Sequence, residues 1–160
     1  MTVESVRAFF KEKAPDIEVT EHNYSTASVA EAAATIGVEP GQIAKTLAIK
    51  TGDKIMLVVT RGDARLDNKK LKAAFGGRPT MLGIEVVAEL TGHPVGGVCP
   101  FGLIQPLPIF CDISLKDFDV VHPAAGSKNS SVCLTPARIV ELTGAEWTDV
   151  CQSSQAVQAA

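Results

Sequence analysis

The order of the predicted helices and strands indicates a mixed α/β domain rather than a doubly wound parallel sheet. Two predicted strands follow each other through a short turn, and three more follow one another late in the chain, a pattern of hairpins and not of regular βα alternation. The 160 residues, 46% of them hydrophobic, suffice for one domain with its own core and are few for two. We therefore expect a single domain over residues 1–150 and a fraying Gln/Ser/Ala-rich tail over 151–160.

The first half of the chain predicts two helices and a hairpin. Apolar residues at helical spacing over 3–10 predict the first helix, and residues 17–21 alternate as a strand does. Ser28-Val-Ala-Glu31 forms a capping box, so an alanine-rich helix begins there and ends at Gly37. Residues 43–49 and 54–60 predict two strands joined by a Thr-Gly-Asp turn.

The second half predicts three helices and three strands. Asp67 caps a basic helix that ends at Gly76-Gly77, and a short helix over 84–90 ends at Gly92. Residues 107–112 form an apolar, strand-like run, and shorter strands are expected at 120–121 and 132–134. Thr135-Pro136 then provides an N-cap and a proline at the first position of the last helix.

Positive charge is concentrated in one segment of an otherwise acidic chain. The net charge is −3, yet residues 45–78 contain nine basic and three acidic side chains. Such asymmetry favours a partner that carries phosphates. The alternative is that the lysines around positions 69–72 only form a solvated face of a helix. Aromatic residues are 5% of the chain, so a base-stacking platform is not expected.

Several classes of protein are excluded by composition and motifs. The apolar runs are too short to cross a bilayer, and the N-terminus does not resemble a signal peptide, which predicts a cytoplasmic protein with neither membrane nor DNA as partner. The four cysteines lack zinc-site spacing, so neither a metal nor another cofactor is expected. Nucleophile-elbow, Walker and dinucleotide-binding motifs are absent.

The segment from Gly92 to Pro100 is the most unusual in the chain. Three glycines and two prolines fall within nine residues, which predicts a shaped loop whose bare N–H groups hold a carbonyl or phosphate oxygen. His93 in this loop is a candidate for orienting a ligand or transferring a proton. Cys99 is a candidate nucleophile, although nothing local lowers its pKa visibly. A purely structural turn is the alternative.

Lys45 is the most notable charged residue, because a strand over 43–49 places it on one face with Ile43, Leu47 and Ile49. A lysine on an apolar face is costly unless it meets an anion or reaches water. It is therefore a candidate for binding a phosphate or polarising a carbonyl, opposite the glycine loop, with a solvated strand-edge lysine as the alternative. A late Ser/Asn loop adds polar groups that suit either a ligand or a turn: Ser127, Asn129, Ser130 and Ser131.

Four stretches in order resemble the YbaK/ProX family of aminoacyl-tRNA deacylases, which is related to the editing domain inserted in bacterial prolyl-tRNA synthetases. They are Lys45-Thr46-Leu47, the loop Gly92-x-x-Val95-Gly96-Gly97-x-x-Pro100, the segment from Gly126 to Pro136, and Gly144-Ala-Glu-Trp-Thr-Asp149. The likeness covers about residues 3–150. It implies a curved, mostly antiparallel mixed central sheet flanked by helices.

The resemblance also implies an activity, which is hydrolysis by water of the ester of a mischarged tRNA, of the tRNA(Pro) type. Lys45 would bind near the ester or the terminal phosphate, and the N–H groups around Gly96 and Gly97 would hold the carbonyl oxygen. The partners implied are the 3′ acceptor end of tRNA and prolyl-tRNA synthetase. The further residues expected to bind substrate are Tyr24, Thr46, His93, Val98, Cys99, Pro100, Ser127 and Asn129.

Two other functions remain open from the sequence. A domain of the same fold that binds tRNA or another RNA without turnover would keep the pocket and the basic segment. A cysteine hydrolase would use Cys99 as its nucleophile. The identity of the amino acid removed is not fixed by the sequence.

Overall fold

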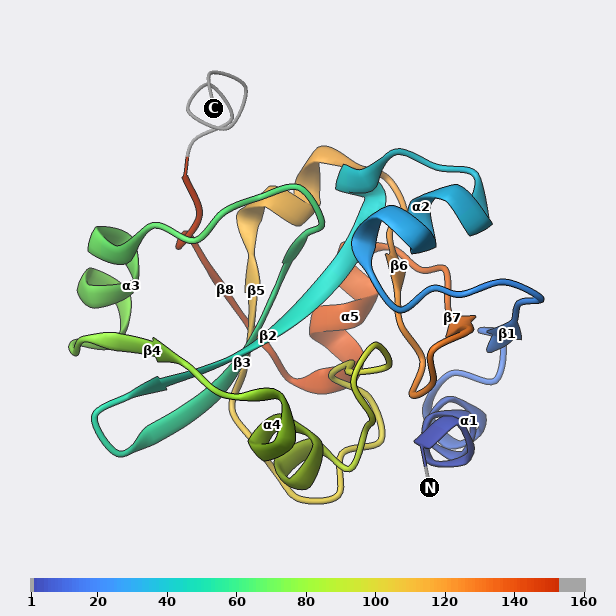
Figure 1. The fold of residues 1–160 in the computed structure, drawn as a ribbon, viewed down its shortest axis with the longest axis horizontal. Coiled ribbons are helices and arrows are strands. Elements are labelled where there is room, and N and C mark those ends of the chain that lie inside the picture. The colour runs from blue at the N-terminus through green and yellow to red at the C-terminus, as the bar shows by residue number, and fades with distance from the viewer. Residues whose placement is uncertain (1, 153–160) are drawn as a thin grey trace.

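The computed structural model describes residues 2–152, which fold around a six-stranded mixed sheet (Figure 1). Five strands follow the order β4-β2-β3-β5-β8, and β6 pairs with β2 beyond this path. Pairing is antiparallel between β2 and its neighbours β3 and β4, and parallel for β6 on β2, β5 on β3 and β8 on β5. The prediction of a mixed α/β fold with a mixed sheet flanked by helices is confirmed.

The predicted hairpin forms the centre of the sheet. Strands β2 (Ile43–Thr51) and β3 (Lys54–Arg61) pair from Ala44↔Arg61 to Thr51↔Lys54. Because side chains alternate between the faces of a strand, Lys45, Leu47 and Ile49 share one face and Thr46 lies on the other. The remaining strands of this sheet are β4 (Pro79–Met81), β5 (Ile109–Asp112), β6 (His122–Pro123) and β8 (Glu146–Thr148).

Helices pack on both faces of the sheet. On one face α1 (Thr2–Lys13) and α5 (Pro136–Thr143) contribute Phe10 and Ile139 to the largest buried cluster, which also contains Cys111. On the other face Leu71 of α3 (Asn68–Phe75) packs with Ile49 and other strand residues. The two remaining helices are α2 (Val29–Ile36), whose alanines pack on Ile43, and α4 (Ile84–Thr91).

The helix caps that the sequence predicts are present. The Ser28 side chain accepts a hydrogen bond from the Glu31 N–H, Asp67 accepts from Lys70, and Thr135 accepts from Arg138. Each of these bonds satisfies one of the N–H groups that a helix start leaves unpaired. These three helix starts are therefore fixed by local sequence.

Several short strands differ from the sequence expectation. The strand expected over 17–21 is reduced to β1 (Thr20–Glu21), which pairs with β7 (Ser130–Ser131) in a separate two-stranded sheet. The strands expected at 120–121 and 132–134 are represented by the single bridge Val121↔Leu134, with β6 and β7 formed between them. Strand β4 was not predicted, because three residues that begin with a proline carry no alternating pattern.

Two short 3₁₀ helices complete the described chain, η1 (Pro40–Gln42) and η2 (Ile113–Asp117). At the C-terminal end, Cys151 forms an isolated antiparallel β-bridge with Leu66, and the Gln152 N–H donates to Arg65 O. This part of the expected tail is therefore packed against the domain. Residues 153–160 lie outside the described residues. No helix within 2–152 is long and apolar enough to span a bilayer.

Candidate functional site

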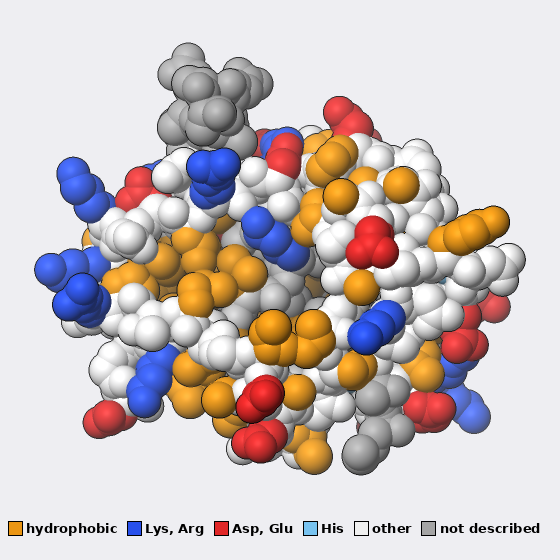
Figure 2. Space-filling model, in the orientation of Figure 1, with side chains coloured by type: hydrophobic (Ala, Val, Ile, Leu, Met, Phe, Trp, Pro, Cys, Tyr) orange, Lys and Arg blue, Asp and Glu red, His pale blue; other side chains and the backbone are white. Residues whose placement is uncertain are grey.

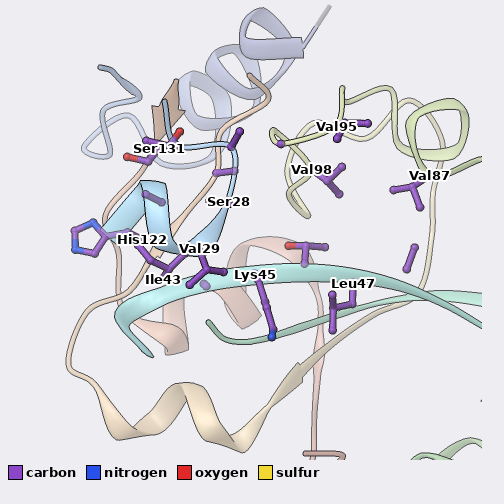
Figure 3. A pocket seen from close by; sticks show the side chains of 18 of the residues that line it. Ser28, Val29, Ile43, Lys45, Leu47, Val87, Val95, Val98, His122 and Ser131 are labelled. Atoms are coloured by element: carbon purple, nitrogen blue, oxygen red, sulfur yellow. The ribbon is translucent and has the colours of Figure 1, made fainter. Parts of the chain in front are cut away.

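A cavity of about 260 Å³ opens along the edge of β2 that lies opposite β3 (Figure 3). Its floor is the strand from Ile43 to Ala48, and its walls come from the start of α2, from α4, from the glycine loop and from β7. The wall side chains are mostly aliphatic, and hydroxyl groups enter from Thr26, Ser28, Thr46, Ser130 and Ser131. Elements distant in sequence therefore enclose one small, largely apolar space.

The glycine loop divides its residues between this cavity and the core. Val95, Gly96 and Val98 line the cavity. His93 and Cys99 are buried at 1% and 0% exposure and face inward, where the His93 Nε2 lies 2.7 Å from Phe101 O. The expected roles of His93, Cys99 and Pro100 in contacting substrate find no support here, since none of the three lines the cavity.

Burial also sets the protonation of the two inward-facing side chains. It raises the pKa of the Cys99 thiol to about 12, against a weaker lowering by its hydrogen bond to Phe101 O. It lowers the pKa of His93, opposed by the bond to the Phe101 backbone. The thiol is therefore held as the neutral, unreactive form, beside an imidazole that is also kept neutral.

Close packing leaves no room for a side chain at Gly96 or Gly97. Of the two backbone N–H groups, only that of Gly96 has no acceptor in the described chain. Gly96 has φ 84°, and a Cβ there would lie 2.8 Å from the Ala27 Cβ. A Cβ at Gly97 would lie 2.5 Å from Ser127 N. The Gly97 N–H donates to Pro94 O at 2.9 Å, so it is not the carbonyl-binding group that we expected. Within residues 2–152, the N–H groups of Gly96 and Val98 have no acceptor.

Lys45 is among the residues that line the cavity, but its side chain leads away from the glycine loop. In Figure 3 its side chain leaves β2 on the side away from Val95 and Val98. The Nζ atom donates to Ala64 O at 2.6 Å. Burial lowers the pKa of Lys45, Cys151 and Asp63 oppose this, and nearby Arg65 adds to it. The ammonium thus does not face the glycine loop, as the sequence suggested, but lies on the other side of β2, where both Asp63 and Arg65 influence its pKa.

Thr46 is the residue of the expected set that lies most directly in the cavity. Its Oγ1 is buried and has no hydrogen-bond partner within the described chain. Buried hydroxyl groups in folded proteins are nearly always paired, so an unpaired one in a cavity wall marks a position that a ligand can satisfy.

The late Ser/Asn loop acts mainly on its own neighbours. Ser127 Oγ donates to Ser130 Oγ at 2.6 Å, and Asn129 Nδ2 donates to His22 O at 3.0 Å. Neither Ser127 nor Asn129 lines the cavity, whereas Ser130 and Ser131 do. This loop therefore bonds to the segment that carries Thr26 and Ala27 to the cavity wall, and it reaches the cavity through Ser130 and Ser131 only.

Tyr24 does not line the cavity, because its side chain is 76% exposed and lies outside the wall. The residues that sequence reasoning missed are aliphatic ones of α2 and α4, together with His122, whose pKa is lowered by burial and by His22. Their only sequence signal is apolar helical spacing, which also describes any core helix. No group of three metal-ligating side chains occurs within residues 2–152.

The basic segment forms a charged surface over α3 and the β2–β3 turn. Figure 2 shows Lys and Arg side chains gathered over α3 and the β2–β3 turn, around a hollow of hydrophobic side chains. Six basic residues of the segment are exposed: Lys50, Lys54, Arg65, Lys69, Lys72 and Arg78. Two others are engaged locally, since Arg61 pairs with Asp63 and Asp117 and Lys70 pairs with Asp149. The exposed cations leave this surface positively charged.

Comparison with known proteins identifies the family. The sequence profile of the aminoacyl-tRNA editing domain matches residues 24–142. The chain belongs to the aminoacyl-tRNA editing domain family. This editing domain is 45% identical over 154 residues to the uncharacterized protein YwhH of Bacillus subtilis (strain 168), covering 95% of this chain and 98% of that one.

Two further relatives connect the editing domain with prolyl-tRNA synthetase. It is 32% identical over 110 residues to proline–tRNA ligase of Bacillus licheniformis, covering 68% of this chain but 19% of the ligase. A crystal structure described as "a putative trans-editing enzyme for prolyl tRNA synthetase" matches with a TM-score of 0.86 and 32% identity, covering 94% of this chain and 97% of that one. The suspected YbaK-like family is thereby confirmed.

Proposed function

We propose that this editing domain hydrolyses the ester that joins a wrong amino acid to the 3′ end of a tRNA, acting in trans on tRNA of the prolyl type. The observation that carries the proposal is the largely apolar cavity at the β2 edge, which is lined by two residues of the glycine loop, Gly96 and Val98, whose backbone N–H groups have no acceptor in the described chain. The matched structure named for trans-editing is covered over 97% of its length, which supports action as a separate domain.

The chemistry required is the addition of water to an activated ester. Water adds to the ester carbonyl, the bond to the ribose oxygen breaks, and the amino acid and the tRNA leave separately. Positioning and stabilisation of the developing oxyanion supply most of the acceleration for such a reaction. The Gly96 and Val98 N–H groups are the donors that we assign to this oxyanion, in place of Gly97.

Lys45 serves the tRNA end rather than the ester in this proposal. Its ammonium lies on the face of β2 away from the glycine loop and beside Arg65. Asp63 offsets part of this positive charge, but it is itself paired with Arg61, so the half-buried ammonium and Arg65 still favour a phosphate, whose negative charge compensates the cost of burial. Lys45 therefore holds the phosphate next to the terminal adenosine and fixes the ester in the cavity.

The rival cysteine mechanism is disfavoured by the structure. Cys99 is fully buried, does not line the cavity and has a pKa raised to about 12. A hydrolase nucleophile needs an accessible thiolate.

We further propose that the domain works in the cytoplasm, where charged tRNA is made, and that prolyl-tRNA synthetase is a partner.

A panel of mischarged tRNAs tests the proposal. Each tRNA carries a radiolabelled Ala, Cys, Ser or Thr, and ester loss and tRNA binding are measured with the same protein sample. We expect at least one ester to be lost far faster with protein than without it. Binding of the tRNA without accelerated ester loss would instead identify a tRNA-binding module, and would overturn the proposed activity.

A further inference from the structure

The edge of β2 that faces the cavity is interrupted. On this edge β6 pairs with Ile43 and Ala44, and β4 pairs with residues 49–51. Within the described chain, no strand pairs with Lys45–Ala48 on this side. The Leu82 N–H donates to Ala48 O at 3.2 Å and closes one end of the gap.

The alternation of a strand identifies which backbone groups face the gap. In a β-strand, the N–H and C=O of one residue point to the same edge, and those of the next residue point to the other. Because Ala48 O points toward β4, the N–H and C=O of Thr46 and the N–H of Ala48 also point to the open edge. The corresponding groups of Lys45 and Leu47 point toward β3.

Thr46 therefore offers one donor and one acceptor side by side on the cavity floor. In an antiparallel ladder, a hydrogen-bonded pair consists of two residues that exchange both bonds, each using its own N–H and C=O. An aminoacyl ester has the same two groups on adjacent carbons, an α-ammonium donor and a carbonyl acceptor. It is thus a single residue that can complete the interrupted ladder.

We propose that the aminoacyl group binds in the gap as a one-residue strand, with Thr46 C=O accepting from the α-ammonium and Thr46 N–H donating to one lone pair of the ester carbonyl oxygen, whose other lone pair remains for the N–H groups of the glycine loop. The inference rests on the proposed function and specifies its substrate class. The substrates are esters of amino acids with a free α-amino group. Peptidyl-tRNA and N-acylated aminoacyl-tRNA do not fit, because the amide nitrogen carries no charge and its acyl group meets the cavity wall.

The side-chain walls agree with this arrangement. Val29 and Ile36 of α2, Val87 of α4 and Val98 of the glycine loop lie around the floor. A small aminoacyl side chain contacts these aliphatic groups while its polar groups remain on the strand. Backbone recognition also explains why the floor contains small residues, Ala44 and Ala48, at the positions next to Thr46 on the same face.

A binding experiment with non-hydrolysable analogues tests the inference apart from catalysis. The probe is 3′-deoxyadenosine bearing alanine through a 3′-amide, and its matched controls are the N-acetyl form and the form in which lactate replaces alanine. Backbone amide shifts of ¹⁵N-labelled protein are followed during titration. We expect the largest shifts at Thr46 and Ala48, with smaller ones at Lys45 and Leu47.

The dissociation constants give the second readout. A hydrogen bond to a charged group contributes about 1.5–3 kcal/mol, so both controls should bind about tenfold more weakly or worse. Equal binding by the lactyl form would overturn the ammonium bond, even if the N-acetyl form is excluded by its bulk. Absence of shifts at Thr46 and Ala48 would overturn the inference entirely. Binding at Thr46 by a protein that fails to hydrolyse any mischarged tRNA would refute the proposed function and leave the inference standing.

Discussion

Strand β2 has a paired neighbour on both sides at each end, but along its middle it has β3 on one side and a cavity on the other. The paired ends supply rigidity, because their backbone groups are bonded and Ile43 and Ile49 are buried in two different clusters. The open middle keeps free backbone groups in a fixed position between them. The difference shows how a sheet can hold unpaired backbone groups in a fixed position on the floor of a cavity.

Alanine variants of the two lysines of β2 test this comparison, and one of them should give the largest loss of deacylation rate that we expect. Lys45→Ala removes the ammonium that we assign to the phosphate next to the terminal adenosine, and deacylation should fall about 100-fold or more, because the ester is then no longer held in position. Lys50→Ala, at an exposed position in the paired end, should change the rate by about twofold or less when the protein is in excess over the tRNA, because it removes one of six exposed cations and touches no part of the cavity. Single-turnover deacylation measures both, with circular dichroism as the check on folding. Equal losses in the two variants would remove any special role for Lys45.

Two glycines with the same backbone angle sharpen the comparison further. Gly37 and Gly96 both have φ 84°, but a Cβ at Gly37 meets open space whereas one at Gly96 meets Ala27 in the cavity wall. Each alanine substitution costs about 1 kcal/mol of unfolding free energy for the left-handed conformation. Only Gly96→Ala should also displace the loop and slow deacylation, by about tenfold or more.

Urea denaturation and deacylation rates together separate these two effects. A Gly96→Ala protein with the same rate as Gly37→Ala would show that the loop does not position the reacting ester.

The hairpin and the capped helices could be predicted from sequence because they depend on near neighbours, as Ser28, Asp67 and Thr135 illustrate. The gap in β2 could not be predicted, since it depends on where β4 and β6 pair with a strand that is distant in sequence. The same dependence on tertiary packing explains why three residues that we expected to contact substrate do not line the cavity. His93 and Cys99 are reactive types that tertiary packing buries, and Tyr24 is left exposed.

His93, the buried histidine of the glycine loop, should make the stability of the protein depend on pH. Burial lowers the pKa of His93 from 6.5, so below about pH 6.5 the unfolded chain binds a proton that the folded chain refuses. The free energy of unfolding should therefore fall as the pH falls, by up to about 1.4 kcal/mol per pH unit for this group. Urea denaturation at pH 7, 6 and 5 measures the slope, which His93→Gln should reduce. An unchanged slope in that variant would show that His93 is not responsible.

The smallest effect on activity is expected at Cys99. Cys99→Ala should leave deacylation within about twofold, while the loss of buried contacts lowers the free energy of unfolding by about 1–2 kcal/mol. Alkylation of the native protein should modify the exposed Cys133 and spare Cys99. A loss of activity in Cys99→Ala that is not accompanied by unfolding would restore the cysteine mechanism.

Filling the cavity is the most direct test that the open middle of β2 is where the ester is broken. Val98→Phe places a ring into the space of about 260 Å³ from the glycine loop, and Val87→Phe does so from α4. The measurement is single-turnover ester loss from a mischarged tRNA, with tRNA affinity determined on the same samples. We predict that both folded variants lose the acceleration while tRNA binding to the basic surface persists. Full activity in a folded variant with the cavity filled would contradict it.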